Sequence, residues 1–110
     1  MNTKAKGNLS EDKAVKFLEN QNYQIIERNF YSRFGEIDII AKKNNIIHFI
    51  EVKSGENFEP IYNITPTKLK RIIKTLNLYI KKHKINNPYQ IDAIIIKNNE
   101  IEYIKNISMF

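Results

Sequence analysis

Two segments of the chain place apolar residues at helical spacing. The first covers residues 8–22 (NLSEDKAVKFLENQN), where Asn8 and Ser10 are both of a type that caps the start of a helix. Apolar side chains then recur three or four positions apart, at Ala14, Phe17 and Leu18. This spacing predicts a short helix with one buried face.

The second helical segment covers residues 65–84 (TPTKLKRIIKTLNLYIKKHK). Thr65 suits the cap position, and Pro66 suits the first turn, where no backbone N–H donor is needed. The expected buried stripe consists of Leu69, Ile72, Ile73, Leu76 and Ile80. The other faces are rich in lysine, so an exposed basic side is expected.

Five further segments have the pattern of β-strands, with apolar and β-branched residues that in part alternate with polar ones. They are residues 23–30, 35–43, 46–53, 89–96 and 101–107. The element order is therefore αβββαββ. Because a helix joins the third and fourth strands, a right-handed parallel crossover is expected there. The sequence predicts a single α/β domain over residues 1–110, with a mixed five-stranded sheet flanked by helices.

The Asn-Asn pair at residues 44–45 determines how the second and third strands pair. Asn tolerates positive φ, so this pair suits a two-residue hairpin turn, as does the pair at residues 98–99. If Lys43 pairs with Ile46, positions whose numbers sum to 89 face each other. Asp38 is then expected opposite Glu51.

This register brings two carboxylates together at the rim of the core, because Glu36, Asp38 and Ile40 share one face and Glu51 and Lys53 end the matching face of the next strand. At about 5 Å and an effective dielectric near 20, two such charges repel by roughly 3 kcal/mol. A divalent cation would offset this repulsion, and oxygen ligands favour Mg²⁺ or Mn²⁺ over zinc. A solvated sheet end without metal is the alternative.

Glu11 shares a helix face with Ala14 and Leu18, which are expected to point inward. We therefore expect its carboxylate to join the group of acids. The alternative is a charge that only stabilises the start of the helix. Glu36 has its own simple interpretation, an ion pair with Lys53, which the register places opposite it.

Metal-assisted phosphodiester hydrolysis is the chemistry that fits these residues. The metal would polarise the phosphate and activate a water, and Lys53 would stabilise negative charge or position that water. His48 faces away from Glu51 and is interpreted as a packed or surface residue. Asp92 interrupts an apolar strand and is expected to cap or pair locally.

Composition narrows the function further. The net charge is +6, with a pI near 9.5, which suits contact with a polyanion such as nucleic acid but also a merely solubilising surface. There is no cysteine and hence no thiolate metal site. No segment reaches the roughly 18 apolar residues of a membrane span, and the N-terminal residues lack the apolar core of a signal peptide. A cytoplasmic protein without membrane contact is expected.

The motifs resemble those of the YraN family of small bacterial proteins, over most of the chain. The resemblance rests on GNLSEDKAVKFL, ERNF, GEIDII, FIEVK and TKLKRI, in that order. It implies a restriction-endonuclease-like fold of the PD-(D/E)XK nuclease superfamily. Three positions depart from the family pattern: Ser10 replaces a glycine, Gly55 an arginine, and Gln90-Ile91 an Arg-Phe pair.

The resemblance also implies roles for individual residues. Asp38, Glu51 and Lys53 are similar to the nuclease core triad, and Glu11 to an additional helix acid beside the metal. Asp38, Glu51 and Glu11 would thus bind the metal. A further set would support the site or contact phosphate: Arg28, Asn29, Lys68 and Arg71.

The first hypothesis is a Mg²⁺- or Mn²⁺-dependent nuclease-like protein that acts on DNA, including branched or processed DNA. The second is a nucleic-acid-binding module that keeps the fold without catalysis, with residues 68–84 contacting phosphates. The third is an interaction protein whose charges only keep it soluble. A homodimer would help if two strands are cut, and the loop over residues 55–63 could close over substrate.

Overall fold

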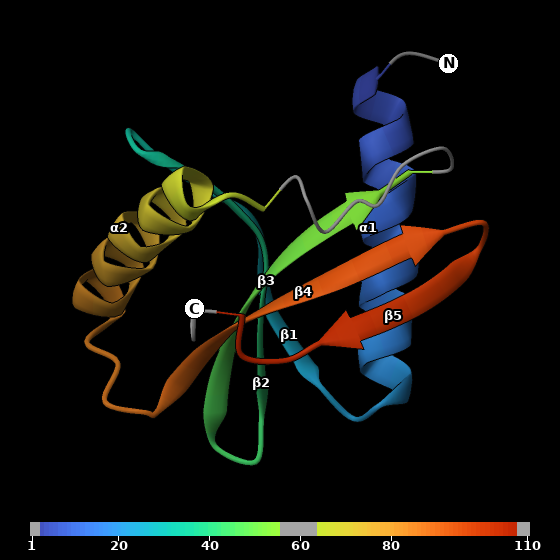
Figure 1. The fold of residues 1–110 in the computed structure, drawn as a ribbon. Helices are drawn as coiled ribbons and strands as arrows, with labels where there is room; N and C mark the ends of the chain where they lie inside the picture. The colour runs from blue at the N-terminus through green and yellow to red at the C-terminus, as the bar shows by residue number, and fades with distance from the viewer. Residues whose placement is uncertain (1–2, 56–63, 108–110) are drawn as a thin grey trace.

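A mixed five-stranded sheet with one helix on each face forms the protein (Figure 1). The structure is a computed structural model that describes residues 3–55 and 64–107. Its elements are α1 (Thr3–Asn20), β1 (Gln24–Ser32), β2 (Gly35–Lys43), β3 (Ile46–Ser54), α2 (Pro66–His83), β4 (Tyr89–Lys97) and β5 (Glu100–Ile104). This order confirms the predicted αβββαββ arrangement. Apart from Gly55, the predicted loop over residues 55–63 lies outside the described residues.

The strands lie in the sheet in the order in which they occur in the chain. β3 and β4 are parallel, as predicted for strands joined by a helix, and the other neighbours are antiparallel. Among the described residues, neither helix is long and apolar enough to cross a membrane.

Both Asn-Asn pairs form the predicted hairpin turns. Asn44 and Asn45 have φ of 52° and 66°, and the pair at residues 98–99 has φ of 52° and 65°. Two successive positive φ values give the turn whose twist matches a hairpin. Lys43 pairs with Ile46, which confirms the predicted register of β2 and β3.

The first helix starts earlier than predicted. It begins at Thr3, so neither Asn8 nor Ser10 caps it, and both lie inside the helix. The residues before Asn8 include alanine and lysine, which favour helix, and the helical conformation therefore continues through them. The inward face is as predicted, because Ala14 and Leu18 are fully buried.

The second helix has the predicted start but a rotated buried face. Thr65 caps it by accepting the Lys68 backbone N–H at 3.1 Å. Ile73, predicted to be buried, is 38% exposed, whereas Thr75 and Tyr79 are buried. Thr75 is held by its hydroxyl, which is 2.8 Å from the Ser32 hydroxyl. Apolar spacing alone therefore misplaced part of the contact surface.

The core has two parts, one on each face of the sheet. The α2-side core contains Ile37, Ile40, Phe49, Leu69, Ile72, Leu76 and Ile91, among others. The α1-side core contains Ala14, Leu18, Ile39, Ile50, Ile94 and Ile96, among others. Both faces of β3 and β4 are covered.

The alternation of side chains in β2 breaks at Asp38. Ile37 belongs to the α2-side core and Ile39 to the α1-side core, although a regular strand would place both on one face. In β1, Asn29 has φ of 54° and lies between residues that pair with Ile39 and Ile37. The expected common face of Glu36, Asp38 and Ile40 is therefore interrupted at Asp38.

Candidate metal centre

The candidate site lies where β2 and β3 stop pairing. Their ladder ends with Ile39 opposite Ile50, one position before Asp38 and Glu51 would meet. There the Asp38 carboxylate accepts the Val52 backbone N–H, with 2.8 Å between Oδ2 and N. The Asp38 carboxylate thus replaces a backbone carbonyl of β2 as the hydrogen-bond acceptor, and β2 and β3 are no longer paired beyond this point.

A cavity of about 380 Å³ occupies this opening, and we call it the acid cavity. Its charged lining residues are Glu11, Glu36, Asp38, Glu51, Lys53 and Lys68. They come from both helices and two strands, so the fold brings together residues that are distant in the sequence. All four residues predicted to be catalytic are among them.

Three carboxylates are grouped closely enough to share one ion. Glu11, Glu36 and Asp38 each offer an oxygen within 4.8 Å of the other two. Glu11 reaches this group from α1 and is 8% exposed. Glu36 was expected to pair with Lys53, but its place in this group makes it a third candidate ligand. The signal for it in the sequence was two acids spaced two positions apart in GEID.

Glu51 borders the same cavity without belonging to that group of three. It is 2% exposed, and within the described part of the chain its Oε1 atom has no hydrogen-bond partner. A buried carboxylate oxygen without a donor is costly unless a cation or a proton compensates it. Glu51 thus contributes a buried carboxylate oxygen without a hydrogen-bond donor among the described residues, as does Glu11 with its Oε1 atom, which is 3.5 Å from Arg28 Nη2.

Crowding and burial make the acids hold protons more tightly. Burial, followed by the negative charge of Asp38, raises the pKa of Glu51 well above its usual value of 4.5. Burial and Asp38 also raise the pKa of Glu11 and of Glu36. At neutral pH the site therefore favours any cation that can compensate these negative charges.

Two lysines stand beside the acids. Lys68 Nζ of α2 is 3.8 Å from Glu51 Oε2, and Lys53 is close enough to affect the charge of Lys68. Burial and the neighbouring Lys53 lower the pKa of Lys68, although Glu51 acts in the opposite direction. The predicted position of Lys68 near the site agrees with these contacts.

The residues present fit a hard divalent cation. The donors are carboxylate oxygens, with no sulfur, and Mg²⁺ and Mn²⁺ prefer such ligands. The unpartnered Glu51 Oε1 atom supplies the second reason, because a bound cation would satisfy it. Asp38, Glu11, Glu36 and Glu51 are the residues that would hold the ion.

Comparison with known proteins assigns the chain to a family. The model described as "Uncharacterised protein family UPF0102" matches residues 10–96. The chain belongs to the UPF0102 family. UPF0102 proteins are YraN-like, so the predicted family membership is confirmed.

Similar UPF0102 proteins occur in several bacteria. One from Helicobacter hepaticus is 56% identical over 109 residues, which cover 99% of each chain. One from Wolinella succinogenes is 54% identical over 97% of this chain and 99% of its own. One from Helicobacter pylori strain HPAG1 is 52% identical over 96% and 92%. The likeness therefore extends over nearly the whole chain.

Arg28 of this UPF0102 protein is directed to acids of α1. Its Nη2 atom is 2.7 Å from Asp12 Oδ1 and 3.5 Å from Glu11 Oε1. Asn29, at the positive φ in β1, also hydrogen-bonds Glu11. These two residues hold Glu11 from the side of β1, and a direct contact of Arg28 with phosphate stays a prediction.

Arg71 lines a different cavity, of about 330 Å³, which we call the basic cavity. Its lining includes Phe34, Glu36, Thr65, Thr67, Lys68 and Arg71. Glu36 and Lys68 line both cavities, so the two are neighbours. Of the two predicted basic residues of α2, Lys68 thus lines both cavities and Arg71 only the basic cavity.

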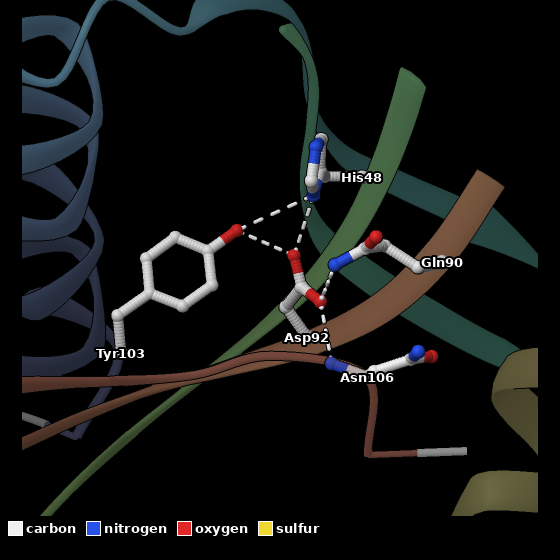
Figure 2. A network of polar contacts seen from close by, with 5 residues as sticks. All are labelled: His48, Gln90, Asp92, Tyr103 and Asn106. Atoms are coloured by element: carbon white, nitrogen blue, oxygen red, sulfur yellow. Dashed lines mark hydrogen bonds and ion pairs between the residues drawn. The ribbon is translucent and has the colours of Figure 1, made fainter. Parts of the chain in front are cut away.

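A second polar cluster lies on the α1 side of the sheet, apart from the acid cavity. Figure 2 shows Asp92 at its centre, with Oδ2 2.6 Å from His48 Nδ1 and accepting the Tyr103 hydroxyl. Gln90 Nε2 and the Asn106 backbone N–H donate to Oδ1, both at 2.8 Å. His48 and Asp92 are buried, which confirms that His48 packs away from Glu51 and that Asp92 pairs locally.

Two of the departures from the YraN pattern have clear contacts. Ser10 donates its hydroxyl to the Ser54 hydroxyl at 3.0 Å, which ties α1 to the end of β3. Gln90, where an arginine was expected, belongs to the Asp92 cluster. Gln90 therefore contacts the Asp92 cluster and does not line the acid cavity.

Proposed function

We propose that this protein is a metal-dependent nuclease-like hydrolase that cleaves DNA phosphodiester bonds, with a restriction-endonuclease-like fold of the PD-(D/E)XK superfamily. One observation carries the proposal: the grouped oxygens of Glu11, Glu36 and Asp38 share a cavity with two lysines and with the buried Glu51, whose Oε1 atom has no hydrogen-bond partner among the described residues. Acids in this number without a cation would repel one another, and lysines beside them suit a phosphate.

The proposed roles follow from position. Asp38, with Glu11, Glu36 and Glu51, binds Mg²⁺ or Mn²⁺. When bound, such an ion polarises the phosphate and lowers the pKa of a water molecule. Lys53 lies two residues after Glu51 on β3, and it orients the attacking water. Lys68 approaches from α2 and stabilises the negative charge that develops on the phosphate.

DNA is the proposed substrate because the surface beside the site is basic. Exposed cations follow α2 at Lys70, Arg71, Lys74, Lys81 and Lys82. Such residues contact phosphates independently of sequence and give binding that weakens with salt. The alternative, a binding module without catalysis, uses the same surface. Action as a homodimer, like a cytoplasmic location, stays a prediction.

The testing experiment incubates purified protein with labelled linear, flapped and four-way DNA in Mg²⁺, Mn²⁺ or EDTA. Wild-type protein is expected to cut at least one substrate in metal and none in EDTA. Asp38→Asn is expected to bind DNA without cutting it. Glu19→Gln is the matched control, because it removes one negative charge from an exposed position of α1 and should cut normally.

Each failure of that experiment has a distinct meaning. Salt-sensitive binding without cleavage of any substrate would contradict the nuclease and support the non-catalytic binding module. The absence of measurable DNA binding near physiological salt would contradict both.

A further inference from the structure

The end of β1 and the turn that follows it place aromatic side chains beside the acid cavity. Tyr31 is 69% exposed, and its hydroxyl hydrogen-bonds the Glu36 carboxylate. Phe34, at the end of this turn, lines the basic cavity together with Glu36. Isolated exposed aromatic residues are ordinary on a protein surface. These two are different because both adjoin one acid of the candidate metal site.

Positive charge accompanies these rings. The Arg33 guanidinium carbon and Lys74 Nζ lie 4.8 and 5.2 Å from the centre of the Phe34 ring. Lys68 and Arg71 line the cavity that Phe34 borders. A groove that combines cations for the backbone with aromatic rings for the bases is typical of single-strand binding sites. The cavity volume, about 330 Å³, lies in the range of small-ligand sites.

We propose that the basic cavity and its rim bind one unpaired nucleotide next to the phosphodiester bond that is cut. The base stacks against Tyr31 or Phe34, and Lys68 and Arg71 hold its phosphate. Lys68 lines both cavities, and it therefore links this nucleotide to the neighbouring phosphate at the acids. The position relative to the cut rests on the proposed nuclease function, whereas the binding itself does not.

The aromatic rim favours an unpaired nucleotide over a duplex. In a duplex the bases stack on one another, so a protein reaches only their edges and the phosphates. Only a base outside the stack offers its face to an aromatic ring, and every base can do so. The preferred DNA therefore contains a single-stranded segment, with little dependence on base identity.

The test is a binding measurement in EDTA, where metal-dependent cleavage does not interfere. Fluorescence anisotropy at fixed salt compares four kinds of short labelled DNA: a single strand, the same strand with an abasic site replacing each base in turn, the same strand abasic at every position, and a hairpin duplex. For wild-type protein, single abasic positions are expected to have little effect, because the site can bind a neighbouring nucleotide, whereas a strand that is abasic at every position should bind about tenfold more weakly, the usual scale of a lost base–aromatic stack. Duplex binding provides the reference for phosphate contacts alone.

Substitutions distinguish the contribution of the aromatic rings to DNA binding from that of the positive charges. Tyr31→Ala and Phe34→Ala are expected to weaken single-strand binding, to reduce the effect of removing every base and to leave duplex binding unchanged. Tyr31→Phe keeps the ring but loses the bond to Glu36, and it should bind like wild type. Arg71→Gln should weaken both DNAs and reduce the dependence on salt. Tyr31 is exposed, so its variants test the inference even if Phe34→Ala does not fold.

Two results would overturn the inference. One is an equal loss of single-strand and duplex affinity in the alanine variants; the other is equal binding of the intact and the fully abasic strand by wild-type protein. If wild-type protein cuts DNA while Tyr31→Ala and Phe34→Ala keep full single-strand affinity, only this inference fails. If the stacking effect is found without cleavage under any condition, the proposed nuclease fails and the nucleotide site stands.

Discussion

Asp38 accepts the backbone N–H of Val52 at 2.8 Å, directly beyond the last residue pair of the β2–β3 ladder. One carboxylate therefore has two tasks: one oxygen completes the hydrogen bonding of β3, and the group as a whole joins Glu11 and Glu36. Because of this double role, different substitutions at Asp38 can remove its negative charge with or without its hydrogen bond to Val52.

Asp38→Asn and Asp38→Ala are expected to differ in stability. Asn keeps an acceptor for Val52 and removes a charge that Glu11, Glu36 and Glu51 oppose, so its free energy of unfolding in EDTA should equal or exceed that of wild type. Ala leaves a backbone N–H unpaired, which costs about 1–3 kcal/mol. Urea denaturation measures both. Equal destabilisation by Asn and Ala would contradict the role assigned to the charge.

Glu51 should make stability depend on pH in the opposite direction to an ordinary paired acid. Its pKa is raised by burial and by Asp38, so the folded protein holds the proton more tightly than the unfolded chain. The free energy of unfolding is therefore expected to fall as pH rises from about 4.5 through the raised pKa. Glu11 and Glu36 act in the same direction.

Glu51→Gln is expected to remove much of this decline and to be more stable than wild type at neutral pH in EDTA. Glu19→Gln should keep the wild-type profile, because Glu19 is exposed. Adding Mn²⁺ should raise the free energy of unfolding of wild type more than that of Glu51→Gln, since a ligand that binds only the folded state stabilises it. Urea titrations across pH measure these effects, and identical profiles for Glu51→Gln and wild type would refute the assignment.

Asp92 is expected to matter for folding and not for catalysis. Burial raises its pKa, but hydrogen bonds from His48, Tyr103, Asn106 and Gln90 together lower it below the usual 3.8. Its stabilisation is therefore present above pH 3.8 and is lost as pH falls through the folded pKa. Without this carboxylate, the buried groups that donate to it lose their acceptor, which costs about 1–3 kcal/mol for each unsatisfied group.

Asp92→Ala should accordingly unfold at much lower urea concentration than wild type. Below its unfolding transition it should still bind metal, because none of the residues of the cluster in Figure 2 lines the acid cavity. A folded Asp92→Ala protein that cannot bind metal would show that the two sites are coupled.

Lys68 is expected to be the more important of two neighbouring lysines on α2. Lys68→Met removes the cation 3.8 Å from Glu51 and should slow single-turnover cleavage about 100-fold, the scale of a lost donor to developing negative charge. Lys70→Met is the control, because Lys70 is exposed on the same helix. Equal effects of the two variants would indicate general attraction of DNA and not stabilisation of the reaction.

Local rules explain which parts of the fold could be predicted. The two Asn-Asn turns require only positive φ in successive residues, and the first of them set the register of β2 and β3 correctly. The cap at Thr65 likewise depends on its immediate neighbours. Features that involve a few adjacent residues were therefore accessible from the sequence.

Features that depend on distant contacts were not. The place of Glu36 among the acids accompanies a break in strand alternation at Asp38, opposite the positive φ of Asn29. Regular alternation gave no sign of that break. The burial of Thr75 depends on a hydroxyl partner in β1, and helical periodicity cannot include such a partner. The hydrogen bond from the Val52 backbone N–H to Asp38 could not be predicted for the same reason.

Manganese binding tests the central claim most directly, namely that these acids are held together to bind a divalent ion. The loss of the free Mn²⁺ signal in electron paramagnetic resonance gives the binding isotherm of wild type, Asp38→Asn and Glu19→Gln, without DNA. Wild type and Glu19→Gln are expected to bind Mn²⁺ with equal affinity, and Asp38→Asn at least about tenfold more weakly, the scale of a lost ligand contact. If wild-type protein binds no more Mn²⁺ than Asp38→Asn does, the acids are not a metal site.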